Sequence, residues 1–290
     1  DFLKKTGGAP TNVAAALAAL GGAVELAAKV GKDPFGKQLI QTMESFGVGT
    51  HAMLEDPNHF TTFAFVSLMH DGERDFVFNR GADGQLSIDD VDAINLNNVG
   101  IIHFGSATGF LPGPLQAAYL HLLQKALHHK IYISFDPNYR HLLFPNNTDS
   151  FVSQSWHFLR NCNFFKVSDE EAMLLTNTST LEAATAFLLK ETSGVFAITL
   201  GKDGTLLGLN GKQYIIESIP VKPVDTTGAG DAFVGAVLYQ LSHLNDTSIQ
   251  QLSLDEWNKI ILNANKAGAR TREYMGTMEA FKYLNNQIFQ

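Results

Sequence analysis

Asp225-Thr226-Thr227-Gly228-Ala229-Gly230-Asp231-Ala232-Phe233 is the most informative stretch of this chain. It follows a segment that contains two prolines, and large apolar residues recur at helical spacing after it. The glycines therefore lie where a loop becomes the first turn of a helix. Because Gly228 and Gly230 carry no side chain, backbone N–H groups can approach an anion there, and the helix dipole adds partial positive charge.

Asp231 places a carboxylate beside this predicted anion site. An aspartate in the first helical turn is by itself a common helix cap. A cap, however, needs neither two flanking glycines nor two threonines. A phosphoryl-transfer site needs such a pattern, since a base must lie beside the phosphate that it helps to attack. The stretch predicts an anion hole at Gly228, Ala229 and Gly230, with Asp231 as the general base.

The same nine residues resemble the C-terminal signature of the ribokinase-like (PfkB) carbohydrate kinases. The resemblance extends over nearly the whole chain and is closest to the fructokinase branch. It implies a three-layer α/β fold, in which a mostly parallel, Rossmann-like sheet lies between helices and carries a small β-sheet lid. It also implies one kinase domain over residues 1–290, which transfers the γ-phosphoryl group of ATP to a sugar hydroxyl, above all the 6-hydroxyl of fructose.

The resemblance further implies two cations. Mg²⁺ would neutralise the phosphates of ATP, since charge neutralisation is most of the work in phosphoryl transfer. A monovalent cation, K⁺, would bind at Asp225 and Thr227, behind the anion hole. There it would order the amides of residues 228–230.

A second motif, Gly7-Gly8-Ala9-Pro10-Thr11-Asn12, precedes an alanine-rich run that Gly21-Gly22 ends. On its own it reads as a turn and a helix start with proline near the first position. It is similar to the family's N-terminal motif, which implies that Gly7, Gly8 and Asn12 contact sugar hydroxyls. An amide side chain suits this task because it both donates and accepts hydrogen bonds. Family members open with a strand that ends in an aspartate, so we expect that this N-terminal strand is missing here.

Residues 31–38, Gly-Lys-Asp-Pro-Phe-Gly-Lys-Gln, have nearly the spacing of a phosphate-binding P-loop after a predicted strand at 24–30. Gln38 stands where a hydroxyl should bind Mg²⁺, and Pro34 removes one N–H group from the cradle. We therefore reject a P-loop and interpret the segment as a surface turn between a strand and a helix.

Two aromatic-rich runs, 61–68 and 74–80, flank an Asp-Gly pair that is typical of a hairpin turn. The resemblance implies that this hairpin, with neighbouring strands, forms a β lid over the sugar at about residues 60–80. Arg80 would then contact the sugar. The phenylalanines at alternate positions fit packing of the lid, a homodimer through the lid, or an ordinary sheet face: Phe63, Phe65, Phe76 and Phe78.

Beyond the lid, apolar strands at about 99–104, 131–135, 164–167 and 195–200 alternate with predicted helices. This order predicts a parallel sheet covered on both faces, with ligands at the carboxyl ends of the strands. Asp136-Pro137-Asn138-Tyr139-Arg140 lies at such an end. It matches the family's Asp-Pro-Asn-x-Arg, which implies that Asn138 and Arg140 contact sugar or phosphate. A buried ion pair between Asp136 and Arg140 is the alternative.

Ser168 and Glu171 have the spacing of a helix capping box. The family carries a glutamate here that acts on Mg²⁺ through water, which implies this role for Glu171. We expect a helix at 255–269 to be the last of the chain, and Asn265 lies on it. The resemblance implies that the following residues, which include two of the anion hole, bind the nucleotide: Lys166, Thr199, Gly201, Gly204, Gly228, Gly230 and Asn265.

Composition narrows the class of protein. The chain has 290 residues, 45% of them hydrophobic, which is enough for one large core. A net charge of −8 argues against a nucleic-acid partner, and no apolar run reaches the roughly 18 residues of a membrane span. The single cysteine, Cys162, indicates a reducing compartment, so we expect a cytoplasmic protein whose ligands are a small sugar and ATP.

Other classes of enzyme lack their motifs in this chain. The ten histidines show no metal spacing, no Gly-x-Ser-x-Gly elbow exists, and no Gly-x-Gly-x-x-Gly opens a helix. Two alternatives stay open: a kinase for 2-keto-3-deoxygluconate or another sugar, and a catalytically silent sugar-binding regulator. Asp231 argues against the silent protein, which could lose this carboxylate without unfolding.

Overall fold

The structure of the chain is a computed structural model that describes residues 5–68, 74–105, 107–244 and 249–290. Its centre is a six-stranded sheet in the order β10-β9-β8-β7-β6-β5. The strands β5 to β8 are parallel, and β9 and β10 are antiparallel additions at one edge. Their bounds are β5 Ile101–Phe104, β6 Tyr132–Phe135, β7 Phe164–Ser168, β8 Val195–Thr199, β9 Thr205–Leu209 and β10 Lys212–Ile216.

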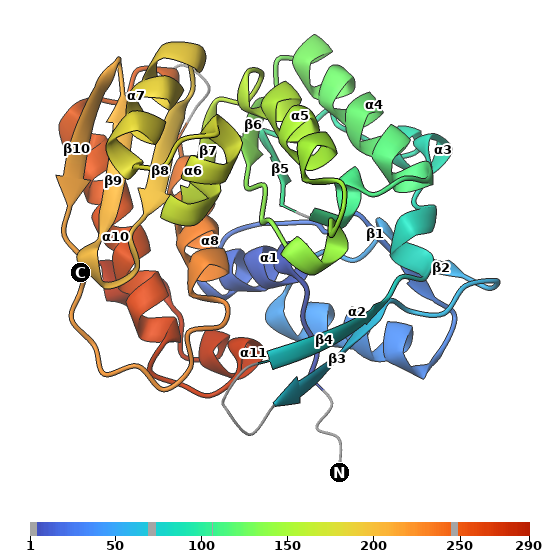
Figure 1. The fold of residues 1–290 in the computed structure, drawn as a ribbon. Coiled ribbons are helices and arrows are strands. Elements are labelled where there is room, and N and C mark those ends of the chain that lie inside the picture. Colours follow the sequence, from blue (N-terminus) through green and yellow to red (C-terminus); the bar gives the residue numbers. More distant parts are fainter. Residues whose placement is uncertain (1–4, 69–73, 106, 245–248) are drawn as a thin grey trace.

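Helices cover both faces of this sheet, which confirms the expected α/β layers (Figure 1). Successive side chains of a strand point to opposite faces, and here they enter separate cores: Phe164 packs in one and Phe165 in the other. One core takes residues of α1 (Ala9–Ala19), α8 (Ala229–Leu241) and α10 (Leu254–Thr271). The other takes residues of α4 (Pro114–His128), α5 (Thr148–Leu159), α6 (Asp169–Thr176) and α7 (Leu181–Glu191).

Close packing of α1 against α8 positions the site. A Cβ atom at Gly235 of α8 would lie 2.8 Å from the Cβ of Ala16 and 3.1 Å from the backbone nitrogen of Leu17. Glycine on one helix and alanines on the other therefore let the two backbones approach. As a result, the N-terminal turns of α1 and α8 lie side by side, although they are far apart in the sequence.

A smaller part of the fold lies beside β5. There β1 (Ala28–Gly31) pairs in parallel with β2 (Met53–Asp56), and α2 (Pro34–Phe46) follows β1. The hairpin of β3 (Phe63–Leu68) and β4 (Arg74–Asn79) projects from this region at the lower edge of Figure 1. The predicted hairpin is therefore present, while its Asp-Gly turn lies outside the described residues. The short helix α3 (Ile88–Asp92) follows.

The register of the hairpin separates the lid residues onto two faces. Phe65 pairs with Val77, and Ala64 pairs with Phe78. Ala64 and Phe78 border a cavity of about 1510 Å³ beneath the hairpin, whereas the exposed side chains of Phe63, Phe65 and Val77 do not border it. The side chain of Phe76 lies outside the described residues. The lid thus has an inner face toward the cavity and an outer apolar face.

The same cavity separates two sheet edges. Among the described residues, β5 is the strand at one edge of the six-stranded sheet, and β1 belongs to a separate two-stranded sheet. Residues of both strands, including Val30 and Ile101, border the space between them.

Three sequence-based boundaries need correction. The strand predicted at 24–30 is regular only from Ala28, because Glu25 makes a single bridge to Gly49. The helix predicted at 255–269 is not the last one, since α11 (Thr277–Phe281) follows after Gly276. A five-residue helix is too short to produce a periodic pattern. The strand predicted at about 99–104 begins only at Ile101.

The turn at residues 31–38 is confirmed as the start of a helix. Asp33 caps α2 by accepting hydrogen bonds from the backbone N–H groups of Phe35 and Gly36. None of the helices in the described ranges is long and apolar enough to cross a membrane.

Candidate active site

The N-terminus of α8 has the geometry of an anion site. Its cap residue Gly228 has φ of 83°, in the left-handed region, and a Cβ atom there would lie 2.2 Å from the side chain of Thr277. Glycine is therefore required at this position. Within the described residues no side chain caps this helix. The first N–H groups of a helix have no partner inside it. Here the N–H of Ala229 donates 3.4 Å to the carbonyl of Thr226 in the preceding turn, whereas the N–H groups of Gly228 and Gly230 make no backbone hydrogen bond within the described residues. These two groups are therefore available to a ligand.

Asp231 lies in the first turn of α8 and borders the large cavity. Its Oδ2 accepts a hydrogen bond of 2.7 Å from Nδ2 of Asn12, which lies in the first turn of α1. The other amide atom of Asn12, Oδ1, is buried and has no hydrogen-bond partner within the described part of the chain. A buried acceptor without a donor is costly, so this oxygen marks a place where a ligand hydroxyl can donate.

Burial raises the pKa of Asp231 to about 6. The hydrogen bond from Asn12 acts in the opposite direction, the charge of Asp136 adds to the increase, and Lys166 and Arg140 lower the value. The carboxylate is therefore ionised at neutral pH, yet it binds a proton more readily than an ordinary aspartate. These are the properties of a general base.

Lys166 of β7 and Asp136, directly after β6, form a buried ion pair with 3.3 Å between Nζ and Oδ2. Burial alone would lower the pKa of Lys166, but the charges of Asp136, Glu171 and Asp231 outweigh it and raise the pKa. A Cβ atom at Gly230 would lie 3.3 Å from this ammonium group. Lys166 thus holds a positive charge next to the predicted anion hole.

The suggested ion pair between Asp136 and Arg140 is not formed. Asp136 pairs with Lys166 instead, because neighbouring parallel strands bring these two side chains to the same edge of the sheet. Arg140 is exposed, donates 2.8 Å to the carbonyl of Tyr139, and borders both the large cavity and a smaller one. Its guanidinium is therefore accessible to a ligand.

The loop after β6 is held from two sides. Asn138 adopts φ of 50°, and its backbone N–H donates 3.0 Å to Oδ1 of Asp136. Oε1 of Glu171 accepts a hydrogen bond of 2.7 Å from the N–H of Tyr139, and Oε2 accepts one of 2.8 Å from the N–H of Ser168. The hydroxyl of Ser168 accepts from the N–H of Glu171, so the predicted capping box is confirmed.

Two hollows meet at Asp231. The large cavity is also bordered by Gly7, Gly8, Asn12 and Asn138. A smaller hollow of about 550 Å³ is bordered by Lys166, Glu171, Gly228, Gly230 and Asp231. One hollow offers hydrogen-bonding groups for a polar molecule, and the other offers positive charge and open N–H groups for an anion. The arrangement can bring a hydroxyl and a phosphate together at one carboxylate.

Asp225 and Thr227 lie in the loop before α8. Oδ1 of Asp225 accepts from the N–H and the hydroxyl of Thr227, and Oδ2 accepts 3.0 Å from the N–H of Gly276. Although burial acts in the opposite direction, the hydrogen bonds from Thr227 and Gly276 lower the pKa of Asp225. The side chain thus ties the anion-site loop to the segment before α11.

Arg80 borders neither hollow in this structure. Its guanidinium donates to the carbonyls of Pro112 and Thr108 at 2.9 and 3.0 Å, and its Nε lies 3.8 Å from Asp83. These bonds join the end of β4 to the loop after β5. The predicted contact between Arg80 and the sugar stays a prediction.

The predicted nucleotide residues of β8 and α10 also lie outside the two hollows. Thr199 donates to the carbonyl of Val167. Gly201 and Gly204 have φ of 63° and 99° in the turn after β8. The amide of Asn265 accepts from Thr205 and donates to the carbonyl of Glu217, which joins α10 to the β9–β10 hairpin.

Sequence reasoning missed His103. This side chain lies in β5, borders the large cavity, and has Nδ1 3.0 Å from the hydroxyl of Ser134. Burial, with the charge of Lys166, lowers its pKa to about 3, so the ring is neutral. The available signal was a polar residue within an apolar strand. Across the described ranges, no three His, Cys, Asp or Glu side chains are grouped so as to hold a metal ion alone.

The sequence profile of the pfkB family carbohydrate kinases matches residues 1–282. The chain belongs to this family. Among its relatives, fructokinase-1 of Zea mays is 33% identical over 283 residues, which cover 96% of this chain and 85% of the maize protein. The signature at residues 225–233 that the sequence analysis singled out therefore identified the family correctly.

Solved structures of family members agree in fold. The fructokinase of Vibrio cholerae O395, in a form that binds fructose, ADP and calcium ion, has a TM-score of 0.83 and 30% identity, covering 99% of this chain and 91% of that one. The aminoimidazole riboside kinase of Salmonella enterica, in complex with aminoimidazole riboside and an ATP analogue, has a TM-score of 0.85 and 27% identity. The match covers 100% of this chain and 92% of the Salmonella chain. The ribokinase-like fold predicted from the sequence is confirmed.

The pKa of Asp231 predicts the acid limb of the pH profile. Since a base must be unprotonated, kcat/KM for the sugar should fall about tenfold per pH unit below about pH 6 and level off above it. Initial rates between pH 4.5 and 8.5 at saturating ATP measure this limb. If kcat/KM for the sugar began to fall only near pH 4, the assignment of Asp231 as the general base would be contradicted.

Proposed function

We propose that this chain transfers the γ-phosphoryl group of ATP to the 6-hydroxyl of D-fructose. The observation that carries the proposal is the position of Asp231 between two hollows of different chemistry. The family and the fructokinase relatives support a sugar as acceptor and ATP as donor.

The residues at Asp231 suit an in-line phosphoryl transfer. The sugar oxygen forms a bond to the γ-phosphorus while the bond from phosphorus to the β–γ bridging oxygen breaks, and ADP leaves. The hydroxyl proton passes to the carboxylate of Asp231. The amides of Gly228, Ala229 and Gly230, together with the ammonium of Lys166, stabilise the charge on the moving phosphoryl group.

The sugar side of the proposal rests on Asn12. Its buried Oδ1 lacks a donor within the described residues, and its Nδ2 is already bonded to Asp231. A sugar hydroxyl that donates to Oδ1 would satisfy this atom and lie beside the base. Gly7, Gly8, Asn138 and Arg140 border the same cavity and complete the proposed sugar site.

The nucleotide would extend from the anion hole over the turn after β8. We assign Thr199, Gly201, Gly204 and Asn265 to this part of the site on the family resemblance. Glu171 fits Mg²⁺ held through water, because it borders the smaller hollow and each of its oxygens can accept a second hydrogen bond besides the one from the backbone. When bound, Mg²⁺ would supply charge neutralisation for the phosphates.

Replacement of Asp231 by asparagine tests the proposed reaction. The variant keeps the size of the side chain but removes the basic charge, so kcat should fall about 10²- to 10⁴-fold with fructose. Binding of sugar and ATP, measured by calorimetry, should change little. Asp255→Asn, in the exposed first turn of α10, is the matched control and should keep the parent rate.

A panel of sugars, including 2-keto-3-deoxygluconate and ribosides, measured on the parent chain identifies the acceptor. A parent chain that binds sugar without phosphorylating any member of the panel would instead support a silent regulator. Parent-like turnover by Asp231→Asn would refute the role of Asp231 as the base.

A second part of the proposal is a K⁺ site at Asp225 and Thr227, behind the anion hole. K⁺ should raise kcat relative to Na⁺ or choline, because an ion there would order the amides of residues 228–230. Rates in the three chloride salts at equal ionic strength measure the effect, and Asp225→Asn should abolish it. Equal rates in all three salts would leave Asp225 as the tie to Gly276 alone.

A third part is a homodimer through the outer face of the lid. The side chains of Phe63, Phe65 and Val77 are exposed by 38%, 49% and 56%, and an isolated two-stranded hairpin is marginally stable in water. Val77→Glu should convert a dimer into a monomer in sedimentation velocity. Ile215→Glu, at a 60% exposed strand position of β10, should leave the mass unchanged. A monomeric parent at tens of micromolar would exclude this interface.

A further inference from the structure

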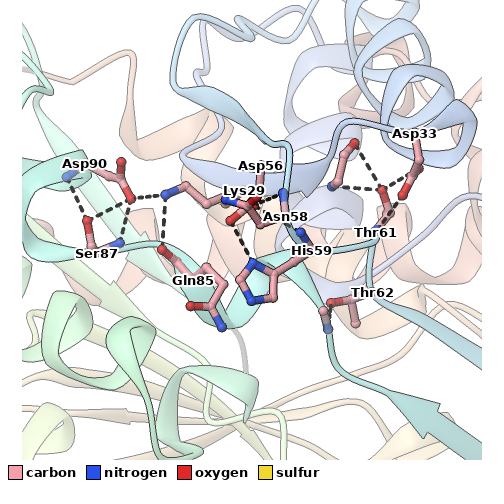
Figure 2. A network of polar contacts seen from close by, with 12 residues as sticks. Lys29, Asp33, Asp56, Asn58, His59, Thr61, Thr62, Gln85, Ser87 and Asp90 are labelled. Carbon is pink, nitrogen blue, oxygen red and sulfur yellow. Dashed lines mark hydrogen bonds and ion pairs between the residues drawn. The ribbon is translucent and has the colours of Figure 1, made fainter.

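The turn that resembles a P-loop is bonded to the base of the lid. Figure 2 shows Asp33 and Thr61 pointing toward each other from two segments that are 28 positions apart. Oδ2 of Asp33 accepts a hydrogen bond of 2.7 Å from the backbone N–H of Thr61, and Oδ1 accepts one of 2.9 Å from the Thr61 hydroxyl. Oδ1 also caps α2 at the N–H groups of Phe35 and Gly36. One carboxylate therefore holds both a helix start and the strand that leads into the lid.

The glycines of the turn make this contact possible. A Cβ atom at Gly31 would lie 2.4 Å from the backbone nitrogen of Thr61, and one at Gly36 would lie 2.1 Å from the carbonyl oxygen of Gly31. In addition, the N–H of Gly31 donates 3.0 Å to the hydroxyl of Thr61, which is buried. The glycine spacing that resembles a phosphate loop thus serves a close approach of two backbones.

The segment that follows β4 is bonded to the segment that precedes β3. The hydroxyl of Thr62 contacts Asp83 and accepts 2.8 Å from the N–H of Gly81, while the N–H of Ala82 donates 2.8 Å to the carbonyl of Phe60. Because the segment before β3 is bonded to the segment after β4, fixing Thr61 in place also fixes the base of both strands. The inner residues of these strands, Ala64 and Phe78, border the large cavity together with Asn12 and Asp231.

We propose that Asp33 is a positioning residue for the sugar site, because its bonds to Thr61 hold the lid hairpin over the large cavity. The proposal rests on the proposed sugar kinase function. The bonds from Gly36, Thr61 and Phe35 lower the pKa of Asp33 although burial opposes them, so the carboxylate is ionised. Charge-assisted hydrogen bonds of this kind are stronger than neutral ones.

Asparagine at position 33 separates the two roles of the carboxylate. Asn keeps one oxygen, which is enough to cap α2, and caps as well as Asp. Its amide NH₂ group, however, cannot accept the hydrogen bond from the N–H of Thr61. Asp33→Asn should therefore loosen the lid and leave the helix cap in place. Thr61→Val removes the hydroxyl contacts, and Thr61→Ser keeps them.

Amide hydrogen exchange and kinetics together test the proposal. In Asp33→Asn and Thr61→Val, exchange of the backbone at 63–68 and 74–79 should become about tenfold faster, as expected for the loss of a hydrogen bond to a charged group. The KM for sugar should rise by a similar factor, with kcat and the KM for ATP within about twofold of the parent. Thr61→Ser should restore parent values.

Thr180→Ala is the matched cap control, because Thr180 caps α7 by accepting only from the N–H of Ala183. It should lower the melting temperature without changing lid exchange or the KM for sugar. If Asp33→Asn behaves like this control, Asp33 is only a helix cap and the proposal is wrong. If the parent phosphorylates no sugar, the proposed function fails, and the exchange rates of the lid still decide whether Asp33 positions it.

Discussion

The hydrogen bond between Asn12 and Asp231 is the contact on which the site depends. It joins side chains 219 positions apart in the sequence and links the N-terminal turns of α1 and α8. The bond is possible because Gly235 lets α8 lie directly against the alanines of α1. Close helix packing thus brings an amide with an open acceptor next to a carboxylate at an anion site. One interface in the core thus places the two groups that we propose to hold the acceptor hydroxyl.

Buried charges of both signs surround this bond. Asp136, Glu171 and Asp231 are acidic, and the charge of Lys166 acts on all three, while Arg140 also acts on Asp231. Burying ions is expensive unless they are paired, and the pair of Lys166 with Asp136 meets this condition. The balance also sets the chemistry: burial raises the pKa of Asp231 to about 6, and the hydrogen bond from Asn12 and then the nearby positive charges limit the increase. The Asp231 carboxylate remains ionised at neutral pH and still accepts a proton readily.

Loops around the site are held by side chains that each serve two segments. Glu171 caps α6 and binds the loop after β6, Asp225 holds its own turn and Gly276, and Asp33 caps α2 and binds the base of the lid. Each carboxylate accepts backbone N–H groups that would otherwise lack partners, which stabilises loops that have no regular structure. The polar segments near the cavity are therefore fixed without a rigid sheet of their own.

The sequence by itself determined the family, the layered α/β fold, the start of helix α8 after Gly228 and the capping box at Ser168. These features are local: glycine positions, apolar periodicity and cap spacing depend on neighbouring residues. Only the tertiary structure decided that Asp136 pairs with Lys166 rather than Arg140, that Arg80 binds carbonyls, and that His103 is neutral in the cavity wall. Such partners come from different strands and loops, and their distances and burial arise from packing, which no spacing in the chain records.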